Sequence, residues 1–265
     1  MAGYKEIKGF QVQTREDDPS PTEAQTGDFY YNSSTGQFRV ITEGGAPIGT
    51  WSSGGNTNLK RSTSAGAGVS SSAALLMSGY DGSNPTNAVE QYNGSSWTEV
   101  SEVNTGRSYV RGCGTYTAAL CTGGSPSSGS GNELWNGSGW TEVGDLSRPN
   151  SRSDGGQFGT TAAALAFGGE PVSALTEIWD GTSWTEVNDL NTARFAVTGF
   201  GTTTAGVAAN GRAPSVSSSA EDWDGTTWTA SGNLNTARGD ARASGVGPAT
   251  TGIIFSGSTG NHTNT

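Results

Sequence analysis

The residue types that support nucleophilic or metal-dependent chemistry are scarce in this chain. It has one histidine, His262, and two cysteines, Cys113 and Cys121. A serine or cysteine hydrolase normally needs a histidine base, and a zinc or copper site needs clustered histidines and cysteines. His262 stands in a polar stretch near the last residues of the sequence. We therefore expect no catalytic triad, no metal centre and no cofactor.

Acidic residues are more numerous, and a pair of carboxylates is what glycoside cleavage requires. Asp180 and Asp224 each stand directly before a glycine. The Asp-box of sialidases has one residue between its Asp and its Gly, so the match fails by one position. Catalysis also requires one unique constellation, whereas the acidic residues here recur at one position of a repeat. The sequence therefore predicts a protein that is not an enzyme.

The chain repeats itself with a period of 43 or 44 residues. Each copy holds an acidic residue, an aromatic residue two positions later, a tight turn and a tryptophan, and an arginine usually follows ten residues after that tryptophan. The second copy reads SRPNSR there and carries its arginines at Arg148 and Arg152. The repeated positions are Glu90, Tyr92, Trp97, Arg107, Glu133, Trp135, Trp140, Glu177, Trp179, Trp184, Arg194, Glu221, Trp223, Trp228 and Arg238.

Each copy is typical of four short strands. A Gly-, Thr- and Ala-rich hairpin comes first, and a variable loop and a second hairpin follow. The second hairpin turns at Asn-Gly or Asp-Gly, which tolerate the positive φ that a twist-matched turn requires. Four strands per repeat of this length indicate a β-propeller blade. We expect the recurring Glu and Arg to form ion pairs between strands or blades, and the aromatic pairs to pack between blades or, alternatively, to stack on sugars.

The ring is expected to close with a shared blade. Trp51 precedes Arg61 by the same ten residues that separate Trp97 from Arg107, so half a copy stands ahead of the first full one. The sequence predicts an all-β, five-bladed propeller over residues 21–265, with an open β-solenoid as the competing architecture. Its blades would span about residues 61–107, 108–152, 153–194, 195–238, and 239–265 plus 27–60, the last with outer strands from 27–51 and inner strands from 240–256.

Composition and charge indicate which binding partners and which cell compartment to expect. The net charge is −10 and no Lys/Arg cluster occurs, which disfavours nucleic-acid binding. No apolar run approaches the roughly 18 residues of a membrane span, and the N-terminal MAGYKEIKGF lacks a signal-peptide core. Two cysteines cannot form a disulfide framework, and they either face each other across a hairpin or lie reduced and buried in strands. We expect no nucleic acid, no membrane insertion and synthesis in a cytoplasm.

The repeat resembles the kelch family over roughly residues 61–256. The resemblance rests on a Gly-Gly pair after the second strand, an acidic and an aromatic residue before a turn, a tryptophan after it and then an arginine. The turn between Tyr92 and Trp97 is slightly shorter than is usual in kelch repeats. The Gly-Gly pair is present as Gly123-Gly124 and Gly168-Gly169. In later copies it is replaced by Asn210-Gly211 and Ser256-Gly257. The resemblance implies a kelch-like propeller.

The N-terminal fifth is similar to the opening of structural proteins of tailed bacteriophages, especially marine ones. MAGYKEIKGF is followed by a polar, Pro-containing stretch and by GDFYYNSSTGQFRV, a run that heads fibre or appendage proteins. The resemblance implies a virion protein, made in the host cytoplasm, whose residues 1–20 form an arm that binds other virion proteins. It also implies a display domain beyond that arm.

The copies diverge most between their second and third strands. In a propeller these loops share one face with the segments that link the blades, and loops carried on a scaffold often hold the function. Their Ser, Asn, Gly and few charged residues suit hydrogen bonding to a host-surface glycan or protein, and a purely structural decoration role is the alternative. The candidate binding residues on this face are Asp81, Asn84, Ser127, Glu170, Arg212, Asn261 and His262.

Overall fold

A computed structural model describes residues 13–16, 29–40, 54–126, 129–147 and 155–259. These residues form strands, bridges and turns, and no helix occurs among them. The chain divides between Ser53 and Gly54 into two compact units. The all-β class predicted from the sequence is therefore confirmed for the described residues.

The first unit holds a three-stranded sheet. Strands β2 (Phe29–Asn32) and β3 (Gln37–Val40) form an antiparallel hairpin, and β1 (Gln13–Arg15) pairs in parallel with β2. Asn32 closes the hairpin turn, because its side-chain Oδ1 accepts a hydrogen bond from the Thr35 amide at 2.9 Å. The described part of the segment expected to supply outer propeller strands thus forms this separate sheet.

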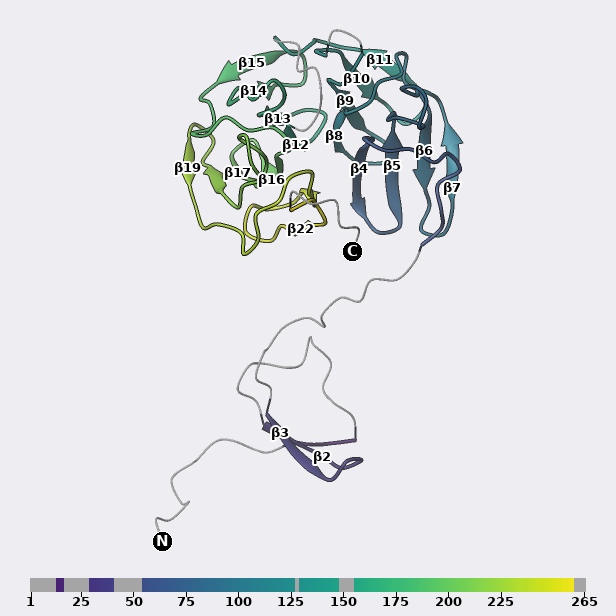
Figure 1. The fold of residues 1–265 in the computed structure, drawn as a ribbon. Coiled ribbons are helices and arrows are strands. Elements are labelled where there is room, and N and C mark those ends of the chain that lie inside the picture. The colour runs from purple at the N-terminus through teal and green to yellow at the C-terminus, as the bar shows by residue number, and fades with distance from the viewer. Residues whose placement is uncertain (1–12, 17–28, 41–53, 127–128, 148–154, 260–265) are drawn as a thin grey trace. The chain divides into compact units, whose positions relative to one another are not determined.

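The second unit contains a propeller-like ring of four sheets, each built on four strands in chain order, and the fourth sheet carries one further strand (Figure 1). The first strand of each blade lies toward the centre of the ring and the fourth lies at its periphery. The strands are β4 (Ala65–Ser70), β5 (Ala73–Met77), β6 (Val89–Tyr92), β7 (Trp97–Val100), β8 (Arg111–Gly114), β9 (Ala119–Thr122), β10 (Asn132–Trp135), β11 (Trp140–Glu142), β12 (Gly156–Gly159), β13 (Ala164–Phe167), β14 (Thr176–Trp179), β15 (Trp184–Val187), β16 (Thr198–Thr202), β17 (Ala205–Ala209), β18 (Ala220–Trp223) and β19 (Trp228–Ala230).

The residues after the fourth blade do not form the expected fifth blade. β20 (Arg242–Ala243) and β22 (Ile254–Phe255) form a two-stranded sheet, and β21 (Gly245–Val246) instead pairs in parallel with β16. The prediction of five complete blades with a shared closing blade is therefore not what the structure shows: it has four. The physical reason is that β2 already has two partners, β1 and β3, in its own sheet.

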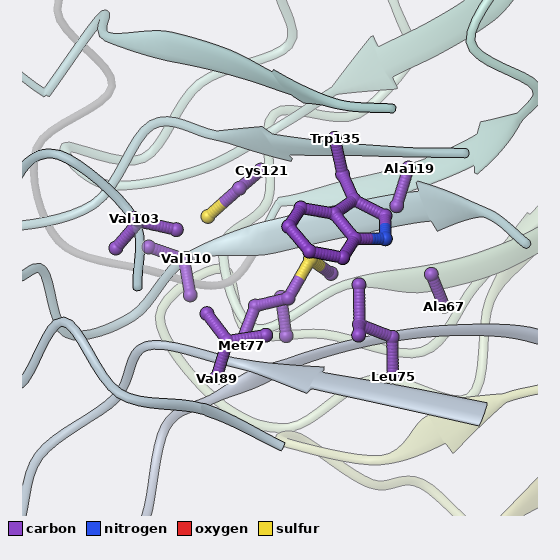
Figure 2. Packing of buried hydrophobic residues seen from close by; sticks show 10 residues of the cluster. Ala67, Leu75, Met77, Val89, Val103, Val110, Ala119, Cys121 and Trp135 are labelled. Carbon is purple, nitrogen blue, oxygen red and sulfur yellow. The ribbon is translucent and has the colours of Figure 1, made fainter. Parts of the chain in front are cut away.

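Neighbouring blades are held together by apolar side chains that interdigitate between their sheets. Trp135 of the second blade is 2% exposed and packs in a cluster with Leu75, Met77 and Val89 of the first (Figure 2). Phe158 and Phe167 of the third blade lie in the corresponding cluster with Trp228 of the fourth. Burying large aromatic side chains in this way is the main apolar contribution to blade association.

The small residues of the inner strands make room for these rings. The Phe158 ring lies against Gly206 of the next blade, and the Phe167 ring lies against Gly156 and Gly199, so closely that a Cβ at any of the three glycines would overlap the ring. The composition of the first hairpin in each copy is thus explained by close packing, because protein interiors tolerate little added volume.

The Gly-Gly pair after each second strand has a specific backbone requirement. Its first residue adopts φ near +60° in each copy, which asparagine and serine also reach: Asn210 has φ 58° and Ser256 has φ 63°. Its second residue adopts φ of 98° to 127°, and that position is always glycine. The departures from Gly-Gly that the sequence shows therefore occur only where a side chain is tolerated.

The packing of Phe158 predicts the effect of adding one methyl group in the neighbouring blade. Gly206→Ala should lower the free energy of unfolding by about 1–3 kcal/mol, because the new Cβ overlaps a buried ring. Gly139→Ser is the control, since nothing lies within 4 Å of a Cβ there and three other copies carry a Ser or Thr at this position. Urea unfolding of both variants measures the difference, and equal midpoints would contradict the packing explanation.

Candidate functional site

A buried ion pair recurs at the boundary between successive blades. Arg107 leads into the second blade, and its Nη2 lies 2.8 Å from Oε1 of Glu133 on β10. Its Nη1 donates to the carbonyls of Gly123 at 2.9 Å and Gly131 at 2.6 Å. The other oxygen of Glu133 accepts from the backbone amide of Asn104 at 2.7 Å, so one carboxylate joins the third strand of a blade to the segment that arrives from the blade before.

The same arrangement occurs in other blades. In the fourth blade Arg194 pairs with Glu221 at 2.8 Å, and the Asn191 amide donates to the second Glu221 oxygen at 2.7 Å. In the first blade Arg61 pairs with Glu90 at 2.9 Å. In the third blade Glu177 accepts from the Ser147 amide at 2.9 Å, while Arg148 and Arg152 lie outside the described residues. We call the arginine, the glutamate and the amide together the blade lock.

The blade lock places full charges in the protein interior. The side chains of Arg194 and Glu221 are 0% and 4% exposed. Desolvation by burial lowers the pKa of Arg194 from its ordinary value, and the Glu221 carboxylate acts in the opposite direction. A buried charge is tolerated only when it is paired and hydrogen-bonded, which is how these groups are arranged. This geometry assigns the recurring Glu and Arg a structural role.

The aromatic pairs of the second hairpins are also mainly buried. Trp135 and Trp140 have ring centroids 5.3 Å apart, and the other three pairs lie within 5.0 to 5.4 Å. Trp135, Trp179 and Trp223 are at most 2% exposed. These three indoles fill space between blades and have no free face on which a sugar could stack. Tyr92 and Trp97, on the first blade, are half-buried.

The loops between second and third strands lie on the same face as the blade links. The Gly79 amide donates to the Arg107 carbonyl at 2.8 Å, and the Gly169 amide donates to the Arg194 carbonyl at 2.8 Å. In the first and third blades the loop is therefore tied at its start to the link that leaves its own blade. We call the surface formed by these loops and links the loop face.

The candidate binding residues of the loop face differ in their surroundings. Asp81 and Asn84 are exposed, and Asp81 Oδ1 accepts the Ser83 and Asn84 amides at 2.7 and 2.8 Å, which lowers the pKa of its carboxyl. Arg212 is half-buried and pairs with Asp240 at 3.0 Å. Glu170 is half-buried. Ser127, Asn261 and His262 lie outside the described residues.

Two tyrosines of the loop face were not predicted from the sequence. Tyr80 is 38% exposed and exchanges backbone hydrogen bonds with Ser62, and Tyr109 is 40% exposed and donates its amide to the Thr63 carbonyl at 2.9 Å. The two aromatic residues therefore flank one dipeptide. Tyr109 also adopts φ of 59°, which is uncommon for a bulky residue. One sequence signal could have pointed to Tyr80 and Tyr109: the other copies of the repeat carry no tyrosine at the corresponding positions.

Both cysteines are buried and free, so the structure favours the reduced alternative. Burial raises the pKa of Cys113 to about 12 and that of Cys121 to about 11, which leaves the thiols protonated and unreactive at neutral pH. Among the described residues no group of three or more His, Cys, Asp or Glu is placed to hold a metal ion. Nor does the described part of the chain contain a helix long and apolar enough to cross a membrane.

Comparison with protein-family models and with curated proteins gives no match for this chain.

The blade lock predicts a large effect of one isosteric change. Glu221→Gln leaves the guanidinium of Arg194 buried without a carboxylate, so the free energy of unfolding should fall by about 3 kcal/mol or more. Glu186→Gln, an exposed glutamate on an outer strand, is the matched control and should change it by less than about 0.5 kcal/mol. Thermal and urea unfolding measure both. Equal losses from the two variants would show that the buried pair contributes nothing specific.

The Asp-Gly turns predict a pH dependence. Backbone amides donate to Asp180 and Asp224 and lower the pKa of each carboxyl, so their contribution to stability is present at neutral pH and is lost as the pH falls through the lowered values. Asp224→Asn should keep the turn, as Asn93 does in the first blade, and should melt with a weaker acid dependence than the wild type. Melting temperatures measured from pH 7 to pH 2 test this, and an unchanged acid dependence would contradict it.

Proposed function

We propose that this chain is a non-enzymatic structural or appendage protein of a phage particle, and that its loop face recognises a host-surface glycan. The observation that carries the recognition role is the gathering of the most divergent segments of the repeat on one face. Exposed polar groups and two exposed tyrosines lie together there, beside a framework whose buried charges are paired in the blade lock. A rigid scaffold with one variable face is a common plan for binding proteins.

The chemistry of the first-blade loop suits a neutral polyol. A tyrosine ring offers a flat apolar platform for the C–H face of a sugar, and its hydroxyl hydrogen-bonds to sugar hydroxyls. Tyr80 and Tyr109 supply two such rings, and Oδ2 of Asp81 can accept from a hydroxyl, because the hydrogen bonds within the turn use Oδ1. These contacts favour glycan recognition over binding of an apolar surface.

The proposal also includes the phage setting and a kelch-like propeller with five blade positions. The sequence GDFYYNSSTGQFRV supports the phage setting. The recurrence of the arginine, the positive-φ pair and the inner strands in residues 238–257 supports a fifth blade position. A virion protein of this kind would attach to the particle through residues 1–20.

A purely structural decoration protein is the second candidate function. The short last sheet favours it, because β20 and β22 form a two-stranded sheet, which is marginally stable alone and would be stabilised by packing against a neighbouring virion protein. In that case the chain would bind virions and would not bind cells. A glycan-cleaving enzyme is the third candidate, and release of reducing ends from host polysaccharide would identify it.

The glycan proposal predicts that the two exposed tyrosines matter for binding. Tyr80→Ala and Tyr109→Ala should each weaken binding to a glycan array or to host cells by about tenfold, the usual loss when a stacking aromatic is removed. Tyr116→Ala is the matched control, because Tyr116 is equally exposed, at 39%, but stands in a turn at the opposite end of the strands. Equal binding by all three variants would exclude this site.

The virion assignment is tested separately from the binding site on the loop face. Antibodies raised against the chain should label particles of the virus that encodes it, and free protein should coat host cells and block infection. Labelled particles without binding to cells would favour the decoration role, and unlabelled particles would contradict the virion assignment.

A further inference from the structure

Tyr80 and Tyr109 are both anchored through their backbones to one short segment of the loop face. Ser62 and Tyr80 exchange two backbone hydrogen bonds, of 2.9 Å from the Ser62 amide and 2.8 Å from the Tyr80 amide. The Tyr109 amide donates to the carbonyl of the next residue, Thr63, at 2.9 Å. The dipeptide formed by Ser62 and Thr63 therefore holds two aromatic residues, one from the first blade and one from the start of the second, at a set separation.

The backbone conformation of Tyr109 belongs to the framework of the repeat. Tyr109 stands two residues after the recurring arginine Arg107. Wherever the structure describes this position, φ lies between 53° and 59°: at Thr63, Tyr109, Ala196 and Asp240. The Asp240 amide donates to the Ala196 carbonyl at 3.3 Å, which repeats the bond of the Tyr109 amide in another pair of blades. The framework thus imposes a left-handed backbone here, whichever side chain the position carries.

Tyrosine is a costly residue at such a position. A left-handed backbone is unfavourable for bulky L-residues, whereas glycine and asparagine adopt it more readily. Asn210 has φ of 58° in this chain. The other described copies carry threonine, alanine or aspartate at the position of Tyr109, so the fold itself does not select an aromatic ring there. Contact with a ligand explains the tyrosine better than packing does.

The two tyrosines form separate platforms. Tyr80 and Tyr109 are 38% and 40% exposed, so each ring is partly covered by the protein and retains surface for a ligand. Among the described residues, the aromatic pairs in contact have ring centroids 5.0 to 5.4 Å apart, and Tyr80 with Tyr109 is not one of these pairs. The backbone steps between the two residues limit the separation of their Cα atoms to about 14 Å. This arrangement suits different sugar residues of one glycan chain.

The surroundings of the two platforms are polar and carry negative charge. Ser62, on the segment between the tyrosines, is exposed, and its hydroxyl can donate to and accept from sugar hydroxyls. Asp81 follows Tyr80 and is exposed. The Asn84 and Ser83 amides donate to Asp81 Oδ1 and lower the pKa of its carboxyl, so the side chain is charged at neutral pH. That charge, with the net charge of −10, disfavours acidic sugars.

We propose that the loop face binds a linear, neutral oligosaccharide across Ser62 and Thr63, with one sugar residue stacked on Tyr80 and another on Tyr109. A sugar residue between these two lies over Ser62, so the ligand is a glycan chain of at least three residues, recognised along its length. A single terminal sugar does not fill this site. The inference rests on the proposed function, since it specifies the glycan that the loop face recognises.

The physical basis of this selectivity is the set separation of the two rings. Stacking on a tyrosine contributes affinity at each end, and hydrogen bonds to Ser62 fix the register of the chain between them. Because both tyrosines are already anchored by backbone hydrogen bonds, binding pays little for ordering the protein. A glycan too short to reach both rings gains the stacking contribution of one ring only.

The experiment uses the full chain and oligosaccharides prepared by partial hydrolysis of the surface polysaccharide of the host. They are separated by charge and by length, from one to about eight sugar residues. The affinity of the wild-type chain for the neutral fractions should rise by about tenfold or more at the length that first reaches both rings, and should change little beyond it. Isothermal titration calorimetry measures the affinity for each fraction.

Variants separate the two platforms. Tyr80→Ala removes one ring, and Tyr109→Asn removes the other while supplying a residue that adopts a left-handed backbone readily. Each variant should bind the long fractions about tenfold more weakly and should no longer distinguish long fractions from short ones. Tyr116→Ala is the matched control and should keep the length dependence of the wild type. Melting temperatures show that each variant is folded.

Three results would overturn this inference and leave the proposed function intact. A single sugar that binds as tightly as the long fractions would show that both rings hold one residue. A length dependence that persists in Tyr80→Ala and in Tyr109→Asn would place the glycan elsewhere on the loop face. Tighter binding of acidic fractions would exclude the neutral class. Absence of binding by every fraction would instead contradict the proposed function, and the inference would fall with it.

Discussion

The buried ion pair between an arginine of the blade link and a glutamate of the third strand is the interaction on which the ring depends. It is made between segments that are 26 to 29 residues apart, and the same carboxylate also accepts an amide of the chain arriving from the preceding blade. Because the charges are desolvated, removing one partner is far more damaging than never having formed the pair. The pair therefore fixes both the internal register of a blade and its position against its neighbour, and this explains why it recurs while the loops beside it vary.

The glycines follow from the same requirement for close approach between blades. Phenylalanines of the third blade reach across to the backbone of their neighbours, and glycine at positions 199 and 206 allows this. After each second strand, a residue near φ +60° and a glycine beyond it turn the chain back onto the arginine carbonyl, as the bond from Gly79 to Arg107 illustrates. Ion pair, glycine turn and aromatic wedge thus form one unit, and a copy that has only some of these parts, such as residues 238–257, is recognisably incomplete.

The sequence was sufficient to predict the strand hairpins, because an Asn-Gly or Asp-Gly turn with an aromatic residue on each side is a local signal that tertiary contacts do not need to reinforce. It also allowed the framework positions to be separated from the variable loops. The sequence did not predict how the propeller ring closes. The interval from Trp51 to Arg61 does not determine whether β2 pairs with β1 or with a distant strand. The loop-face tyrosines were missed for a related reason: the exposure of Tyr109 and its contact with Thr63 are tertiary features, and a repeat that lacks tyrosine elsewhere does not encode them.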